Sequence, residues 1–207
     1  MEQTKQAAVG CVIMASGRVR FGSDKLLADF GGAPLIARAL AVTASPALAA
    51  RVVVTRSAEV ARLARAAGAA TVLHSLPGRN DTVRLGLDAL LGECPGLGGG
   101  IFLPGDQPLL RRESLESMVR DFHAQKETER VILRLGWRAG GAEPLLGSPV
   151  LFGSGHFDAL RALPEGRGGG VVIRQHPGCV RAVYAQSAEE LEDADTVERL
   201  EALKRFL

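Results

Sequence analysis

The sequence predicts an α/β fold, with a single doubly wound, mostly parallel sheet flanked by helices. Short apolar runs alternate with helical stretches over residues 1–135, at the spacing of βαβ units. The first run, residues 7–14, is apolar throughout, as expected of a strand that is buried on both faces. Polar, glycine-bearing segments follow this run and the run at 101–103, at the edge where α/β sheets bind ligands.

Each strand is predicted from a short apolar run rich in Val, Ile, Leu and Ala. Such runs are typical of parallel strands that are covered on both faces. The predicted strands are residues 7–14, 51–55, 70–73, 101–103, 131–135 and 179–184.

The helices are predicted from their end signals. Pro34 lies near the first turn of the first helix, where its fixed backbone angle is tolerated. Ser57 caps an Ala- and Arg-rich helix that ends near Gly68. Asn80 or Asp81 is expected to cap the third helix. The predicted helices cover residues 33–44, 57–68, 80–91, 113–125 and 196–206.

Two segments interrupt this alternation. Residues 93–100 resemble turn material, and their GLGGG run, residues 96–100, predicts a flexible loop. Residues 136–170 are rich in Gly and Pro and predict an insertion within one domain. We therefore expect a single domain over residues 1–207.

The composition excludes several classes of protein. The 207 residues are 46% hydrophobic and 23% charged, which allows a packed core. The net charge of +2, without a dense basic run, argues against a nucleic-acid surface. No apolar run reaches the ~18–20 residues that span a bilayer, so no membrane partner is expected. The polar N-terminus and three widely spaced cysteines favour a reduced, cytoplasmic protein.

The segment after the first strand combines small residues with positive charge. Backbone N–H groups of small residues approach phosphates closely, and Arg20 and Lys25 would neutralise them. The segment has neither the G-x-x-x-x-G-K-[ST] pattern nor the G-x-G-x-x-G pattern. It predicts a phosphate-binding loop of another type, or else a surface loop with scattered basic residues.

Asp106 follows the fourth predicted strand, between Gly105 and Pro108. A carboxylate at the carboxyl end of a strand, opposite a phosphate loop, is a suitable Mg²⁺ ligand. The alternative is that Asp106 forms an Asx-type turn. The nearby basic loop favours the metal interpretation.

Six segments, in order along nearly the whole chain, carry a family resemblance. They are Met14-Ala15-Ser16-Gly17 with Arg20-Phe21-Gly22 and Lys25-Leu26-Leu27, then GGAPLI (31–36), NDTVRLGL (80–87), GDQPL (105–109), GSPVLF (147–152) and DADT (193–196). Together they resemble the molybdenum cofactor cytidylyltransferase family, which has a nucleotide-diphospho-sugar transferase-like fold. Residues 136–170 would then be a substrate-side insertion.

The resemblance implies Mg²⁺-dependent transfer of CMP from CTP, or another NTP, to a molybdopterin-type phosphate monoester, with release of pyrophosphate. It also implies a molybdoenzyme or its maturation factor as a partner. The resemblance implies a catalytic role for Arg20, Lys25 and Asp106, with Arg20 and Lys25 binding the triphosphate. It implies Mg²⁺ binding by Asp106 and Asp195, where Asp193 would hydrogen-bond instead of binding the metal. The implied nucleotide-binding residues are Met14, Ala15, Ser16, Gly17, Lys25, Asp81, Arg84 and Asp106.

The chain departs from the family pattern in four places. The loop between Gly17 and Arg20 is one residue short, Ser16 replaces Ala or Gly, and Val197 replaces a proline. The usual G-D-x-G-A-R is absent near residues 164–170, so an acidic role there falls to Glu165 or to no residue. These departures leave open a non-catalytic cofactor-binding or delivery protein on the same fold, or a transferase that uses GTP or another acceptor.

Overall fold

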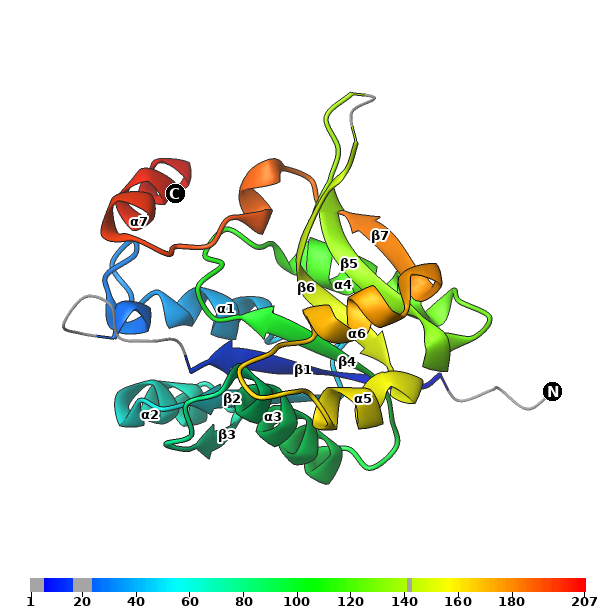
Figure 1. Ribbon diagram of the computed structural model, residues 1–207. Helices are drawn as coiled ribbons and strands as arrows, with labels where there is room; N and C mark the ends of the chain where they lie inside the picture. Colours follow the sequence, from blue (N-terminus) through cyan, green and yellow to red (C-terminus); the bar gives the residue numbers. More distant parts are fainter. Residues whose placement is uncertain (1–5, 17–23, 141–142) are drawn as a thin grey trace.

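The computed structural model describes residues 6–16, 24–140 and 143–207. Within these residues, seven strands form one sheet between two helical layers (Figure 1). The strand order is β3-β2-β1-β4-β6-β5-β7, and β6 alone among these strands runs antiparallel to its neighbours. The predicted doubly wound, mostly parallel sheet is confirmed.

The strands are β1 Ala8–Ala15, β2 Ala50–Thr55, β3 Ala70–Leu73, β4 Leu97–Pro104, β5 Ile132–Trp137, β6 Leu145–Gly153 and β7 Val180–Tyr184. The helices are α1 Ile36–Val42, α2 Ala58–Ala66, α3 Arg79–Glu93, α4 Arg112–His123, α5 Phe157–Arg161, α6 Gly170–Gln175 and α7 Val197–Leu203.

The sheet is covered on both faces, as the apolar strands predict. Helices α1, α2, α4 and α7 pack on one face, where Ile13 of β1 lies in the core. Helices α3, α5 and α6 pack on the other face, where the neighbouring Val12 lies. Both side chains are 0% exposed, which is why β1 carries no polar alternation. In the described part of the chain, none of the helices combines the length and the apolar run required to cross a membrane.

The five predicted helices are observed, with ends that differ from the prediction by one to three residues. The Ser57 hydroxyl accepts a hydrogen bond from the Val60 N–H at the start of α2, and Gly68 follows this helix with a φ of +76°. The predicted N-cap of α3, Asn80 or Asp81, was wrong, because Gly78 is the N-cap and the helix begins at Arg79. Asp81 instead lies in the first turn and accepts from the Gly78 N–H at 3.2 Å.

The prediction of a flexible loop over residues 96–100 was wrong. Most of this run lies in β4, where Gly99 pairs with Val9 and Gly100 with Gly10 of β1. A Cβ on Gly99 would lie 2.9 Å from the ring of Phe122. The glycines therefore let the α4 side chain pack directly on the strand.

The predicted irregular segment, residues 136–170, contains strand β6. This strand lies between β4 and β5, and its Leu151 and Phe152 side chains are 0% and 1% exposed. Its apolar stretch, residues 149–152, was read as a substrate-side motif and not as a strand. The segment is therefore partly a central element of the sheet, with the Gly-rich connection to α6 following it.

Two glycines of α3 give a test of this packing. In Gly86→Ala the new Cβ would lie 2.4 Å from Val12 and 3.0 Å from Val54, so the free energy of unfolding should fall by about 1–3 kcal/mol. Gly92 faces open space in the same helix, so Gly92→Ala should raise it by about 0.5–1 kcal/mol. Urea unfolding measures both. Equal effects of the two variants would contradict the close approach of α3 to the sheet.

Candidate active site

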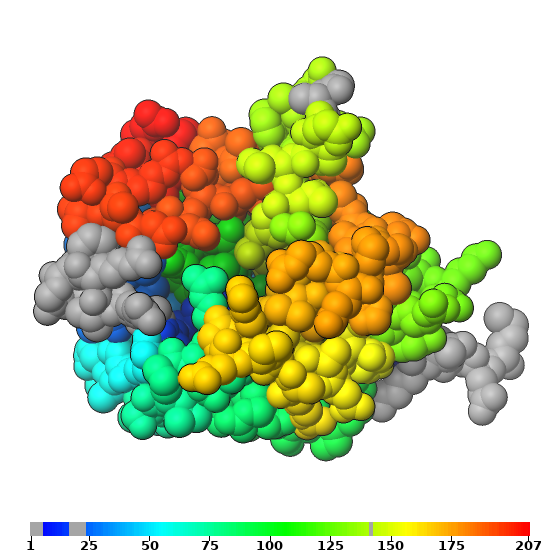
Figure 2. All heavy atoms as spheres, in the orientation of Figure 1, coloured from blue at the N-terminus to red at the C-terminus, as the bar shows by residue number. Residues whose placement is uncertain are grey.

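A cavity of about 600 Å³ lies at the carboxyl ends of β1 and β4. Its lining includes Met14 and Pro104 at the strand ends, the first turn of α3, and glycines of the segment 166–170 before α6. The space-filling view shows this face hollowed between the red C-terminal segment and the yellow-orange segment that leads into α6 (Figure 2). Open α/β sheets bind their ligands at this edge.

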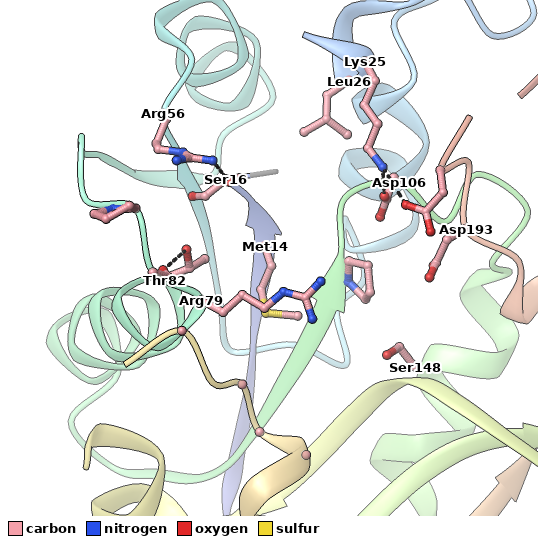
Figure 3. Close-up of a pocket in the computed structure, with 18 residues that line it drawn as sticks. Met14, Ser16, Lys25, Leu26, Arg56, Arg79, Thr82, Asp106, Ser148 and Asp193 are labelled. Atoms are coloured by element: carbon pink, nitrogen blue, oxygen red, sulfur yellow. Dashed lines mark hydrogen bonds and ion pairs between the residues drawn. The ribbon is translucent and has the colours of Figure 1, made fainter. Parts of the chain in front are cut away.

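One end of the cavity holds a lysine between two carboxylates. Lys25 lies on the 3₁₀ helix Lys25–Leu27, Asp106 follows β4, and Asp195 precedes α7. The Lys25 ammonium donates to Asp106 Oδ2 and, at 3.1 Å, to Asp195 Oδ1 (Figure 3). The Lys25 and Asp106 side chains are 15% and 18% exposed, whereas that of Asp195 is 66% exposed. Residues from three distant parts of the chain therefore converge on one point.

Backbone and side-chain hydrogen bonds fix these segments relative to one another. The Ala194 N–H donates to the Asp106 carbonyl at 2.9 Å, which holds the segment before α7 against the turn after β4. The buried Gln107 amide donates to the Ser148 carbonyl at 3.1 Å, which ties the same turn to β6. The position of Asp106 is therefore set from both sides.

The carboxylates shift the pKa values of their neighbours. Burial lowers the pKa of Lys25, but hydrogen bonds and charge from Asp106 and Asp195 outweigh burial, and the net pKa is raised above its ordinary value. The ammonium is therefore charged at neutral pH. Burial raises the pKa of Asp193 to about 6, and the negative charges of Asp106 and Asp195 add to this effect. Negative charge is thus concentrated at this end of the cavity.

These residues fit a divalent cation that shares its coordination with a substrate. Asp106 and Asp195 offer hard carboxylate oxygens that already converge on one cationic group, the Lys25 ammonium. Mg²⁺ prefers one or two carboxylates together with substrate phosphates and water. Across residues 6–16, 24–140 and 143–207, no group of three or more His, Cys, Asp or Glu side chains is placed to hold a metal ion. A cation here would therefore need oxygens from a ligand.

The other end of the cavity is formed by Ser16 and Arg56. The Ser16 hydroxyl donates to the Val54 carbonyl at 3.1 Å and lies 2.8 Å from His74 Nε2. When the hydroxyl proton is directed at Val54, His74 Nε2 carries a proton and donates to Ser16. Burial, followed by the charge of Arg56, lowers the pKa of His74, which favours this neutral form. Arg56 also donates to the Ser16 carbonyl.

The structure brings together part of the predicted set. Lys25 and the following residues line the cavity as predicted: Met14, Ser16, Asp106, Asp193 and Asp195. Ala15 is buried at 3% exposure, so its side chain lies in the core. Asp81 and Arg84 form an ion pair of 3.5 Å with each other on α3 and are not among the lining residues. Gly17 and Arg20 lie outside the described residues. Glu165 is exposed and is also absent from the described lining, so the acidic role considered for it has no counterpart there.

Other lining residues were missed by the sequence interpretation. They include Arg56, Arg79, Thr82, Ser148 and the glycines of segment 166–170. Arg56 directly follows β2, so the rule that ligands bind at the carboxyl ends of strands could have found it. Arg79 lies one residue before the predicted helix over residues 80–91, and no local pattern assigned it to the site. Ser148 lies on β6, and the glycines lie on the connection that precedes α6. The positions of both segments depend on the order of the strands in the sheet, which local patterns do not give.

The sheet order and the cavity at its carboxyl edge are those of an open α/β protein that binds its ligand at the ends of the strands. The chain belongs to the family of MobA-like NTP transferase domains, whose model matches residues 11–180. No curated protein sequence matches the chain significantly.

Solved structures of the same fold cover nearly the whole chain. Rv0371c from Mycobacterium tuberculosis H37Rv is 21% identical, with a TM-score of 0.77 over 96% of this chain and 98% of that chain. A manganese complex of Rv0371c has a TM-score of 0.73 and 20% identity over 97% of this chain and 100% of that chain. A Methanothermobacter nucleotidyl transferase, Mth528, is 17% identical, with a TM-score of 0.76 over 96% and 97% of the two chains. A CMP:2-keto-3-deoxy-manno-octonic acid synthetase complexed with CTP is 15% identical, with a TM-score of 0.70 over 96% and 98%. At these identities the likeness establishes the fold.

Proposed function

We propose that this protein transfers CMP from CTP to the phosphate monoester of a molybdopterin-type cofactor, in a Mg²⁺-dependent reaction that releases pyrophosphate. The observation that carries the proposal is the convergence of Lys25, Asp106 and Asp195 at one end of the cavity. Family membership supports a nucleoside triphosphate as the donor, and the manganese complex of Rv0371c supports a divalent cation. The six sequence segments support the acceptor and a molybdoenzyme or its maturation factor as the recipient, and the three widely spaced cysteines support a cytoplasmic location.

The residues present have definite tasks in such a reaction. A phosphate oxygen of the acceptor forms a bond to the α-phosphorus, the α–β phosphoanhydride bond breaks, and pyrophosphate leaves with the electron pair. Asp106 and Asp195 would hold the divalent cation, which supplies Lewis-acid stabilisation of phosphate charge. Lys25, with Arg20 of the loop outside the described residues, neutralises the triphosphate. Because the attacking oxygen is already an anion, the reaction needs charge neutralisation more than a strong base.

The hydrogen bonds at the opposite end support a base that carries an amino group. With the Ser16 proton directed at Val54 and the His74 proton on Nε2, the Ser16 oxygen has only a lone pair left, so a ligand atom that reaches this oxygen must donate to it. The 4-amino group of cytosine can donate there, whereas the 4-carbonyl of uracil cannot. We therefore expect the site to prefer CTP over UTP.

A thermal-shift panel with Mg²⁺ measures this preference. At about 100 times its Kd, CTP should stabilise the protein by about 2.7 kcal/mol, a Tm rise of about 5–10 °C. UTP should bind about tenfold more weakly, since one hydrogen bond is replaced by a repulsive contact. Ser16→Ala should reduce the difference between the two nucleotides, while Ser117→Ala on the exposed face of α4 should leave it unchanged. Equal shifts with CTP and UTP in the wild type would remove the basis for this assignment.

The direct test of the proposed function is pyrophosphate release from CTP and Mg²⁺ in the presence of a molybdopterin-type acceptor. One observation favours a second candidate, a non-catalytic cofactor-binding or delivery protein: the Lys25 ammonium already satisfies both carboxylates. That candidate predicts nucleotide or cofactor binding without pyrophosphate release. Release with GTP in place of CTP would instead indicate a related transferase with another base preference.

A further inference from the structure

We propose that Arg79 is a catalytic residue that binds the α-phosphate of the nucleotide. This inference rests on the proposed function, because it assumes that the cavity holds a nucleotide. Neither the family resemblance nor the motif analysis assigns Arg79 a role.

The position of Arg79 in the cavity selects the α-phosphate. Arg79 is the first residue of α3, and its side chain extends across the cavity between the Ser16 end and the end formed by Lys25 and Asp106 (Figure 3). A nucleotide with its base near Ser16 and its outer phosphates near Lys25 has its ribose and α-phosphate between these ends. The guanidinium therefore lies beside the expected position of the α-phosphorus, the atom at which the transfer occurs.

The hydrogen-bond partners of neighbouring cations make Arg79 distinctive. The Lys25 ammonium is shared by two aspartates, and Arg84 pairs with Asp81 at 3.5 Å. Within the described residues, the Arg79 guanidinium makes no hydrogen bond or ion pair. A guanidinium is always charged and presents a planar fork of donors that matches two phosphate oxygens. In a cavity already rich in carboxylate, such a cation is suited to an anionic ligand.

The glycine segment before α6 keeps the space beside Arg79 open. The Gly166 N–H donates to Asn80 Oδ1 at 2.9 Å, which ties this segment to the first turn of α3. A Cβ on Gly168 would lie 4.0 Å from Arg79 Cδ, in ordinary van der Waals contact. The glycines of segment 166–170 thus form a wall without side chains next to the guanidinium. A longer side chain at position 168 would therefore crowd Arg79 and narrow the cavity beside it.

This placement gives Arg79 a task in the transfer step. As the acceptor oxygen bonds to the α-phosphorus and the bond to pyrophosphate breaks, negative charge is distributed over the non-bridging α-oxygens. Two guanidinium N–H groups directed at these oxygens stabilise that charge distribution, and they do so without a proton transfer. Lys25 binds the outer phosphates, so the two cations bind different phosphates of the same nucleotide.

Calorimetric titration with ligands that carry no phosphate, one phosphate or three phosphates tests which phosphate each cation binds. Cytidine, CMP and α,β-methylene-CTP are titrated, with Mg²⁺ present, into wild type, Arg79→Ala, Arg79→Lys, Lys25→Ala and the control Arg65→Ala, an exposed arginine of α2. Arg79→Ala should weaken CMP and α,β-methylene-CTP by the same factor, about 10- to 100-fold, and leave cytidine unchanged. Lys25→Ala should weaken the triphosphate analogue but not CMP, and Arg79→Lys should recover part of the CMP affinity.

Different failures have different signatures. If Arg79→Ala binds CMP as tightly as wild type and Arg65→Ala do, the inference is overturned and the proposed function stands. If Arg79→Ala weakens the triphosphate analogue but not CMP, Arg79 contacts the outer phosphates and the assignment to the α-phosphate is wrong. If Arg79→Ala lowers the affinity for cytidine by the same factor, the role of Arg79 is structural. If wild type binds neither nucleotide, the proposed function falls together with the inference. Thermal melts of each variant confirm that the fold is retained.

Discussion

Lys25→Ala is expected to lower the rate of pyrophosphate release from CTP by about 10²- to 10³-fold. The ammonium lies beside both candidate metal ligands and is only 15% exposed, so its charge is weakly screened by solvent. Its loss removes a fixed positive charge from the place where negative charge develops on the departing pyrophosphate. A coupled pyrophosphate assay with CTP, Mg²⁺ and a molybdopterin-type acceptor measures the change.

The same variant has a second expected result in the absence of nucleotide. Because the ammonium no longer competes for Asp106 and Asp195, Mn²⁺ should bind more tightly to Lys25→Ala than to wild type. Titration followed by electron paramagnetic resonance measures this affinity. Lys126→Ala, which replaces an exposed lysine just after α4, is the matched control. In the pyrophosphate assay, a rate of release by Lys25→Ala within threefold of wild type would contradict the role of Lys25 in charge neutralisation.

The edge of the sheet that carries the candidate site was predictable from local patterns. Apolar runs located β1 and β4, and the two strands are parallel neighbours in which Met14 pairs with Pro104. The segments that follow them therefore meet, which brings the lysine loop towards Asp106. The position of Asp195 in the site could not be predicted from these strand ends, since Asp195 lies about 90 residues beyond Asp106 in the chain. Only the resemblance of its DADT segment to a family pattern indicated that it belongs to the site.

Features that depend on long-range packing were not predictable from local patterns. The glycines of β4 resemble a loop locally, and only contacts with distant residues explain them, such as that of the Phe122 ring from α4 at Gly99. Arg79 and Arg84 lie near the same helix start, and local sequence does not distinguish the one that lines the cavity from the one that pairs with Asp81. Their difference arises from where the first turn of α3 meets the sheet edge and the segment before α6.

Asp106→Asn and Asp195→Asn are expected to differ strongly, although both carboxylates contact Lys25. Asp106 is 18% exposed and is held by its neighbours, so an oxygen lost there is not readily replaced by water. Asp106→Asn should lower pyrophosphate release by about 10³-fold, since metal stabilisation of phosphate charge contributes several kcal/mol. Asp195 is 66% exposed, so solvent screens its charge and can take its coordination place. Asp195→Asn should cost about tenfold.

This ranking distinguishes a metal ligand from a simple ion-pair partner of Lys25. If the aspartates only oriented the ammonium, each variant would leave Lys25 with one remaining partner, and the two losses would be similar and small. If they hold a cation, Mn²⁺ affinity should fall in the same order as the rate, with Asp106→Asn the weaker binder. Asp121→Asn, which changes an exposed carboxylate on α4, controls for the general loss of a negative charge. Unchanged Mn²⁺ affinity in Asp106→Asn would show that this carboxylate does not bind the metal, whatever its effect on the rate.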